Sequence, residues 1–256
     1  MSLRDNEGYA RHFDQRNLQM NMSNNTPTLT SPGALEVVLR RGLGVLNLVG
    51  AFAVAIALSI NIADRVIQGI FNPTHYFHFF TIQSSIIDIV VLLVGGILAV
   101  TRTQDSRWYS VVRASTVAYA IVVGVVYNVL LAGIASTDGY VASFEFPNTI
   151  EHIAAPLFLV IEWVLMPGRA RINWGPMWIC AVFPLAWVAG SMVRGLVGDG
   201  WFPYFFFDPA QVGVGGVALY IVAIAAFILG NYAVMAAIGR VHARLFASSG
   251  ANRAAS

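Results

Sequence analysis

The chain has 256 residues, of which 57% are hydrophobic and only 11% are charged, with a net charge of +2. A soluble domain carries about 25% charged residues, so this composition indicates an integral membrane protein and excludes a large soluble domain. The lone Cys180 excludes a disulfide framework and a thiolate metal site.

The first stretch, residues 1–33, is polar and rich in Asn, Ser, Thr and Arg, which is typical of a disordered tail and not of a signal peptide. Six apolar runs follow, each long enough for a bilayer that takes about 20 residues to cross. The fold class is therefore an all-α polytopic membrane protein, with a six-helix domain at residues 34–240 and a basic tail at 241–256. The predicted spans cover residues 42–63, 77–100, 111–134, 150–166, 176–193 and 214–238.

Arginine placement predicts the orientation of these spans. Arginines are frequent in both tails and in the turns around residues 102–107 and 169–171, whereas the opposite loops hold only Arg65 and Arg194. By the positive-inside rule, both termini lie in the cytoplasm. The starts of the second and fourth spans and the aromatic loop at 201–208 then share the outer side.

The second span opens with a polar helical face. Side chains at i, i+3, i+4 and i+7 line up on a helix, and here they are Thr81, Ser84, Ser85 and Asp88. Polar groups are expensive in hydrocarbon, so we expect this face to look into the protein. Thr81 is a candidate nucleophile; the alternative is a hydroxyl bonded to its own helix backbone. Asp88 lies deeper, where Asn128 or Tyr127 is a possible partner.

The fourth span begins with a candidate general base, His152, whose imidazole titrates near neutral pH. Asn148 precedes it by one helical turn, and Asn148 and Glu151 are candidates for holding an oxyanion or orienting the base. Pro156 removes one backbone hydrogen bond and thereby frees the carbonyl of His152. The alternative is an interfacial histidine satisfied by water or backbone.

Two further histidines, His75 and His78, lie close to Thr81 in sequence and are rival bases. Near the inner end of the fourth span, Glu162 is expected to pair with one of three arginines: Arg113, Arg169 or Arg171.

The loop at 200–209 is too apolar for an ordinary solvated loop, and it forms either a lid over an apolar pocket or an aromatic belt. Arg194 before it is suited to a carboxylate or phosphate group; alternatively it snorkels or pairs with an aspartate. The candidate substrate-binding residues are Phe79, Phe80, His78, Arg194, Tyr204 and Asp208.

Several short motifs occur in an order that resembles the androgen-induced membrane protein family and its bacterial relatives over about residues 40–240. They are the run 79–84, Asn148 with His152 and Pro156 ahead of Glu162-Trp163, Arg194-Gly195, and the run 202–209. The animal members are multi-pass hydrolases of fatty acid esters of hydroxy fatty acids that use a threonine nucleophile and a histidine. By motif position, the resemblance implies Thr81 as the nucleophile and His152 as its base.

The expected function is an intramembrane hydrolase that acts on a lipid ester from the outer-leaflet side of a bacterial plasma membrane. Arg194 would hold a carboxylate of the substrate, and no metal, organic cofactor or nucleic acid is expected. A transporter or lipid-binding protein without catalysis is one alternative, in which Asp88, His152 and Arg194 are proton or substrate sites. A structural subunit of a membrane assembly is another.

Overall fold

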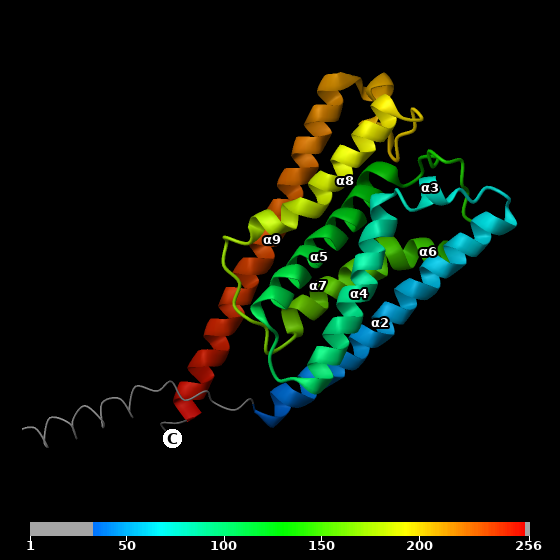
Figure 1. Cartoon of the computed structure of the whole chain (residues 1–256). Helices are drawn as coiled ribbons and strands as arrows, with labels where there is room; N and C mark the ends of the chain where they lie inside the picture. Colours follow the sequence, from blue (N-terminus) through cyan, green and yellow to red (C-terminus); the bar gives the residue numbers. More distant parts are fainter. Residues whose placement is uncertain (1–32, 254–256) are drawn as a thin grey trace, which may run out of the picture. The chain divides into compact units, whose positions relative to one another are not determined.

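Six helices in the described part of the chain are long and apolar enough to cross a membrane. The computed structural model describes the backbone of residues 33–253 and the side chains of residues 33–240, and no strand occurs among them. This confirms the all-α polytopic fold (Figure 1). Apart from Gly33, the predicted disordered tail lies outside the described residues.

Two of the six spans contain more than one helical segment, and two others extend far beyond the predicted span. The first and second are α2 (Ala34–Ile67) and α4 (Phe80–Thr101), and the third is α5 (Arg107–Val126) continued by the π-helix η1 (Tyr127–Leu131). The fourth consists of α6 (Glu145–Thr149), the π-helix η2 (Ile150–Ala154) and α7 (Ala155–Leu165). The last two are α8 (Met177–Val197) and α9 (Pro209–Arg253). The end of the bundle at which α2 begins is called the inner end, after the predicted orientation, and the opposite end is called the outer end. The loops at the outer end contain α3 (Pro73–Tyr76) and the 3₁₀-helix η3 (Phe205–Phe207).

The helices α2 and α9 are much longer than the predicted spans 42–63 and 214–238, and α9 continues through most of the predicted basic tail. The reason is that a hydropathy window locates the hydrocarbon-crossing part of a helix, whereas the helix itself continues until a residue breaks it. After α2 the chain turns at Gly69 (φ 72°), and α9 is kinked at Gly213 (φ 71°).

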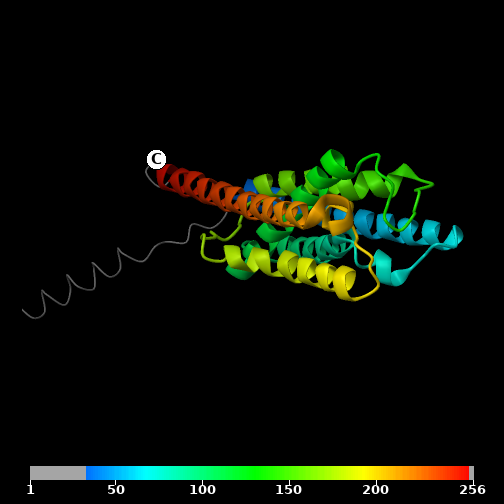
Figure 2. The same cartoon turned by 90° about the horizontal axis from the view of Figure 1, so that it is seen from above.

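The bundle is organised around α5. Half of the span that contains α5 is buried, whereas only 11% of the α9 span is buried. It packs against α4, α7, α8 and α9 (Figures 1 and 2). On one side α2 and α4 form the most extensive helix pair. They approach closely because small residues meet, and a Cβ on Gly44 would lie 2.8 Å from Ala99 Cβ and 3.1 Å from Gly96 O.

The polar face of α4 looks into the protein, as predicted. Ser84, Ser85 and Asp88 are 2%, 3% and 5% exposed. Asp88 Oδ1 has no hydrogen-bond partner among the described residues. Neither suggested partner, Asn128 or Tyr127, forms a hydrogen bond with Asp88 within the described residues, so this prediction is wrong; Asn128 donates instead to Gly124 O and His152 O.

At the inner end of the bundle, four buried ionic side chains form a connected cluster, the inner charge cluster, which consists of Arg40, Asp105, Arg113 and Glu162. Asp105 pairs with both arginines, and Arg113 also pairs with Glu162, which confirms one of the three partners expected for that glutamate.

Arg40 also ties the inner loops together. Its Nε donates to Arg102 O at 2.9 Å and its Nη1 to Pro167 O at 2.7 Å. These carbonyls belong to the turn after α4 and the turn after α7. One α2 side chain therefore connects two turns that are far apart in sequence.

We expect Arg40→Ala to lower the free energy of unfolding by about 3–5 kcal/mol, because it leaves Asp105 as a buried charge with one partner fewer. The neighbouring Arg41 is exposed, so Arg41→Ala is the matched control. The measurement is chemical unfolding of the purified protein in detergent. Equal midpoints for the two variants would contradict a structural role for the inner charge cluster.

Candidate functional site

Two adjoining hollows lie at the outer end of the bundle. The outer cavity has a volume of about 530 Å³ and a mixed polar lining that includes Asn61, Arg65, Phe79, Thr81, Tyr127, Tyr140, Glu145, Asn148, Glu151, His152 and Tyr204. The apolar pocket, of about 130 Å³, lies between α5, α8 and α9, and its lining includes Phe80, Val122, Pro184, Leu185, Ile221, Ile224 and Ile228. Four residues line both hollows: Thr81, Tyr127, Leu131 and Tyr204.

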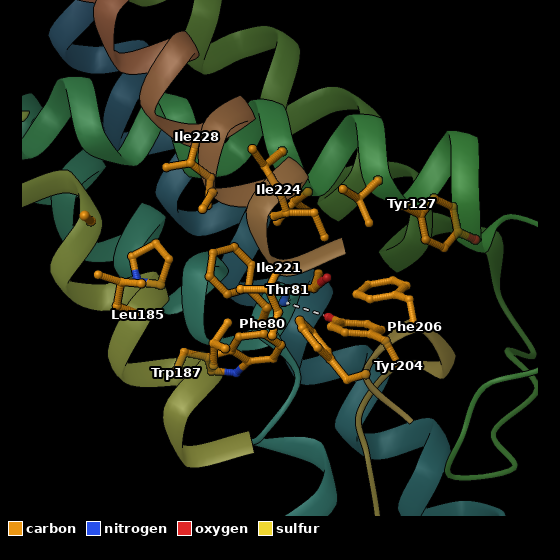
Figure 3. Close-up of a pocket in the computed structure, with 18 of the residues that line it drawn as sticks. Phe80, Thr81, Tyr127, Leu185, Trp187, Tyr204, Phe206, Ile221, Ile224 and Ile228 are labelled. Atoms are coloured by element: carbon orange, nitrogen blue, oxygen red, sulfur yellow. Dashed lines mark hydrogen bonds between the residues drawn. The ribbon is translucent and has the colours of Figure 1, made fainter. Parts of the chain in front are cut away.

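Thr81 occupies the first turn of α4, where backbone N–H groups have no partner within the helix. Its N–H donates instead to the hydroxyl of Tyr204, at 3.4 Å (Figure 3). Burial raises the pKa of Tyr204, so this hydroxyl keeps its proton and can donate it to another group. The aromatic loop thus supplies a hydrogen-bonding group beside the candidate nucleophile.

The two π-helical segments face each other at this site, and the sequence analysis did not predict either of them. His152 lies in η2 and Tyr127 begins η1, and their rings stack with centroids 3.6 Å apart at 18°. Asn128 Nδ2 donates to His152 O at 3.2 Å, so this carbonyl has a side-chain partner ahead of Pro156. Single π-helical turns are frequent at functional sites. Pro156 was the one sequence signal for irregular hydrogen bonding here.

The hydrogen bond of His152 defines its tautomer. Its Nδ1 lies 3.1 Å from Asn148 O, and because a carbonyl only accepts, Nδ1 carries the proton and Nε2 is left as an acceptor. That is the form a general base requires. Within the described residues, no hydrogen bond joins the Thr81 hydroxyl to the His152 ring, although both side chains line the outer cavity.

Glu151 lies beside His152 in η2, and both reach the outer cavity. Its side chain is deeply buried, with 4% of the residue exposed, and Oε1 has no hydrogen-bond partner in the part of the chain described. In residues 33–240, no group of three or more His, Cys, Asp or Glu side chains has the arrangement of a metal site.

Three predicted substrate-binding residues line neither hollow. Arg194 is bound to Asp199, with Nε 3.1 Å from both carboxylate oxygens. Hydrogen bonds from Arg194 hold the pKa of Asp199 at about 2, so the pair stays ionised near neutral pH. This is one of the alternatives that the sequence left open for Arg194.

The other two, Asp208 and His78, also have local partners. Asp208 precedes α9 and accepts from Ala210 N at 2.9 Å, as a helix cap does. His78 Nε2 lies 3.1 Å from the buried Ser191 Oγ, and burial lowers the pKa of His78. Neither side chain is therefore placed to act on a molecule in the outer cavity.

A loop at residues 132–144 forms one wall of the outer cavity, and a buried ion pair between Arg65 and Asp138 fixes it. Tyr140 and Ser143 in the same loop donate to Asp64, at 2.7 and 2.9 Å. From the sequence, Arg65 was interpreted only as a loop charge, because its partner lies 73 residues away.

We expect Arg65→Gln to make the loop at 132–144 cleavable by proteinase K roughly tenfold faster or more, because removing one partner of a buried ion pair costs about 3–5 kcal/mol. Arg194→Gln, which removes the partly exposed pair with Asp199, is the control. Mass spectrometry of the fragments locates the cut. Cleavage of this loop at an unchanged rate would show that the ion pair does not hold it.

No family model, curated protein or solved structure matches this chain.

Proposed function

We propose that the protein is an intramembrane lipid-ester hydrolase of a bacterial plasma membrane, with Thr81 as the nucleophile and His152 as the general base. One observation carries the proposal: Thr81 lies where an apolar pocket meets a polar cavity that also contains His152. A lipid ester has this same division, with an acyl chain on one side of its carbonyl and a polar alcohol on the other. The exclusive use of arginine among the 15 basic residues fits a GC-rich bacterial genome.

In the proposed reaction, the acyl chain occupies the apolar pocket and the alcohol half occupies the outer cavity. Thr81 Oγ attacks the acyl carbon, and His152 Nε2 takes the hydroxyl proton. The bond to the alcohol oxygen then breaks, and the alcohol leaves with the proton from His152. Water attacks the acyl-enzyme, again with His152 as the base, and releases the fatty acid and the free Thr81 hydroxyl.

Two groups are placed to stabilise the oxyanion that forms on the carbonyl. The Tyr204 hydroxyl accepts from Thr81 N–H and keeps its own proton for donation. The side-chain amide of Asn148 lines the same cavity. Tyr204 is bonded to the first turn of α4, whose N–H groups and dipole favour developing negative charge.

A second candidate function is lipid binding without catalysis. The observation that favours it is that the Thr81 hydroxyl and the His152 ring are not hydrogen-bonded to each other within the described residues. Catalytic hydrogen bonds are often long or absent until substrate is bound, so a covalent-labelling experiment is needed to separate the two functions.

We expect a fluorophosphonate probe to label the wild-type protein in membranes and to leave Thr81→Val unlabelled, because valine keeps the shape of threonine and removes its hydroxyl. His152→Gln should lower the labelling rate by roughly 10²–10⁴-fold, the usual contribution of a general base. In-gel fluorescence gives the rate, and peptide mass spectrometry gives the modified residue.

Thr101→Val is the matched control, since Thr101 lies on the same helix at its inner end and is exposed. His78→Gln tests the rival base and should leave the rate unchanged. Persistent labelling of Thr81→Val would remove Thr81 as the nucleophile. A folded wild type that binds lipid yet never forms an adduct would favour the second candidate.

A further inference from the structure

The lining of the outer cavity indicates which kind of alcohol the lipid carries. The cavity is in the size range of small-molecule sites, and its volume of about 530 Å³ leaves room for a compact polar group. Among the described residues, its charged lining consists of Arg65, Glu145 and Glu151.

The charge of Arg65, the one cation of this lining among the described residues, is already paired with a carboxylate of the protein. Arg65 pairs with Asp138, its Nε donates to Asn61 Oδ1 at 3.0 Å, and its guanidinium lies 3.8 Å above the centroid of the Tyr140 ring. Arg65 is 7% exposed, its charge is paired with Asp138, and its Nε and Nη1 donate to protein groups. It is therefore not a free cation for a carboxylate on a bound molecule.

Arg194, the residue expected to hold a substrate carboxylate, does not line the cavity and is bound to Asp199 and to Thr74 O. A carboxylate brought into the outer cavity would thus lose its hydration without gaining a free cation, which is strongly unfavourable. The lining of the outer cavity already contains the carboxyl groups of Glu145 and Glu151.

Glu151, by contrast, needs a hydrogen-bond donor from a bound molecule. Its buried Oε1 has no partner within the described residues, and a buried acceptor without a donor destabilises the protein unless a bound molecule satisfies it. A hydroxyl on the alcohol half of a lipid would donate to this oxygen. An ammonium group would donate as well, but two of the aromatic faces in this lining are already covered, that of Tyr127 by His152 and that of Tyr140 by Arg65.

We propose that the outer cavity takes an uncharged, hydroxyl-bearing alcohol of the glycerol type, with Glu151 accepting a hydrogen bond from one of its hydroxyls, and that it disfavours alcohols that carry a carboxylate. The inference rests on the proposed function, since it names the alcohol half of the ester that Thr81 would cleave. It departs from the carboxylate-bearing substrates that the motif resemblance implied.

The test is a binding measurement with uncleavable ethers, so its result does not depend on catalysis. The matched ligands are 1-O-hexadecylglycerol and 2-hydroxy-3-(hexadecyloxy)propanoic acid, which differ only in a terminal hydroxymethyl or carboxylate. With the full chain in lipid nanodiscs, titration followed by tryptophan fluorescence should give a dissociation constant roughly tenfold or more lower for the glycerol ether.

Glu151→Gln should reduce this preference severalfold, because an amide keeps the shape of the carboxyl group and removes its capacity for negative charge. Asp208→Asn changes an outer-end carboxylate that lines neither hollow, and it should leave the preference unchanged. Asp138→Asn releases Arg65 and should strengthen binding of the acid.

Equal or tighter binding of the acid by the wild type would overturn the inference, even if Thr81 proves to be the nucleophile. Tighter binding of the matched amine, 1-amino-3-(hexadecyloxy)propan-2-ol, than of the glycerol ether would overturn the hydroxyl assignment. If the wild type prefers the glycerol ether but shows no Thr81-dependent labelling, the assignment of the cavity holds and the proposed hydrolase activity is wrong.

Discussion

The structure depends on one constraint: within a bilayer, every buried polar group needs a partner inside the protein. At the inner end this requirement is met in part by the inner charge cluster, which pairs four buried charges and in which Arg40 joins α2 to two turns that are distant in sequence. At the outer end it is met by the ion pair of Arg65 with Asp138 and by the hydrogen bonds of Asp64 to the loop at 132–144. Between these two ends the helices pack through small and apolar residues, as Gly44 and Gly96 do.

Against this background, two acceptors without a partner lie together at the candidate site. Glu151 Oε1 lacks a partner among the described residues, and His152 Nε2 is left as an acceptor because Nδ1 is committed to Asn148 O. Both belong to η2, where the wider π-helical turn brings two successive side chains to one cavity. Thr81 reaches the same cavity from the first turn of α4, and that turn is bonded by Tyr204 from the aromatic loop. The site is thus assembled from η2, the first turn of α4 and the aromatic loop.

The sequence predicted the membrane fold well because hydropathy and helical spacing are local properties. Six apolar runs, the inward polar face of α4 and the pair of Glu162 with Arg113 could all be predicted, the last as one of three choices. The π-helices could not be predicted, because they arise where Tyr127 and Asn128 meet His152 from another helix. The ion pair of Arg194 with Asp199 was predicted only as an alternative to substrate binding, because an arginine at a helix end can bind either an aspartate or an anionic group of a substrate. Contacts between separate helices therefore account for the π-helices, whereas Arg194 and Asp199 are close in sequence and the choice between two suitable partners was left open.

The position of Thr81 between two hollows of opposite polarity has a consequence for the direction of the proposed reaction. After cleavage, the fatty acid would stand in the apolar pocket between α8 and α9, of which α9 has the least buried span in the bundle. The alcohol would stand in the outer cavity, on the side of the water. Each product could then depart into the phase that dissolves it better. Separation of the two products by solubility would keep them from meeting again at Thr81, so that hydrolysis proceeds in one direction without any external source of energy.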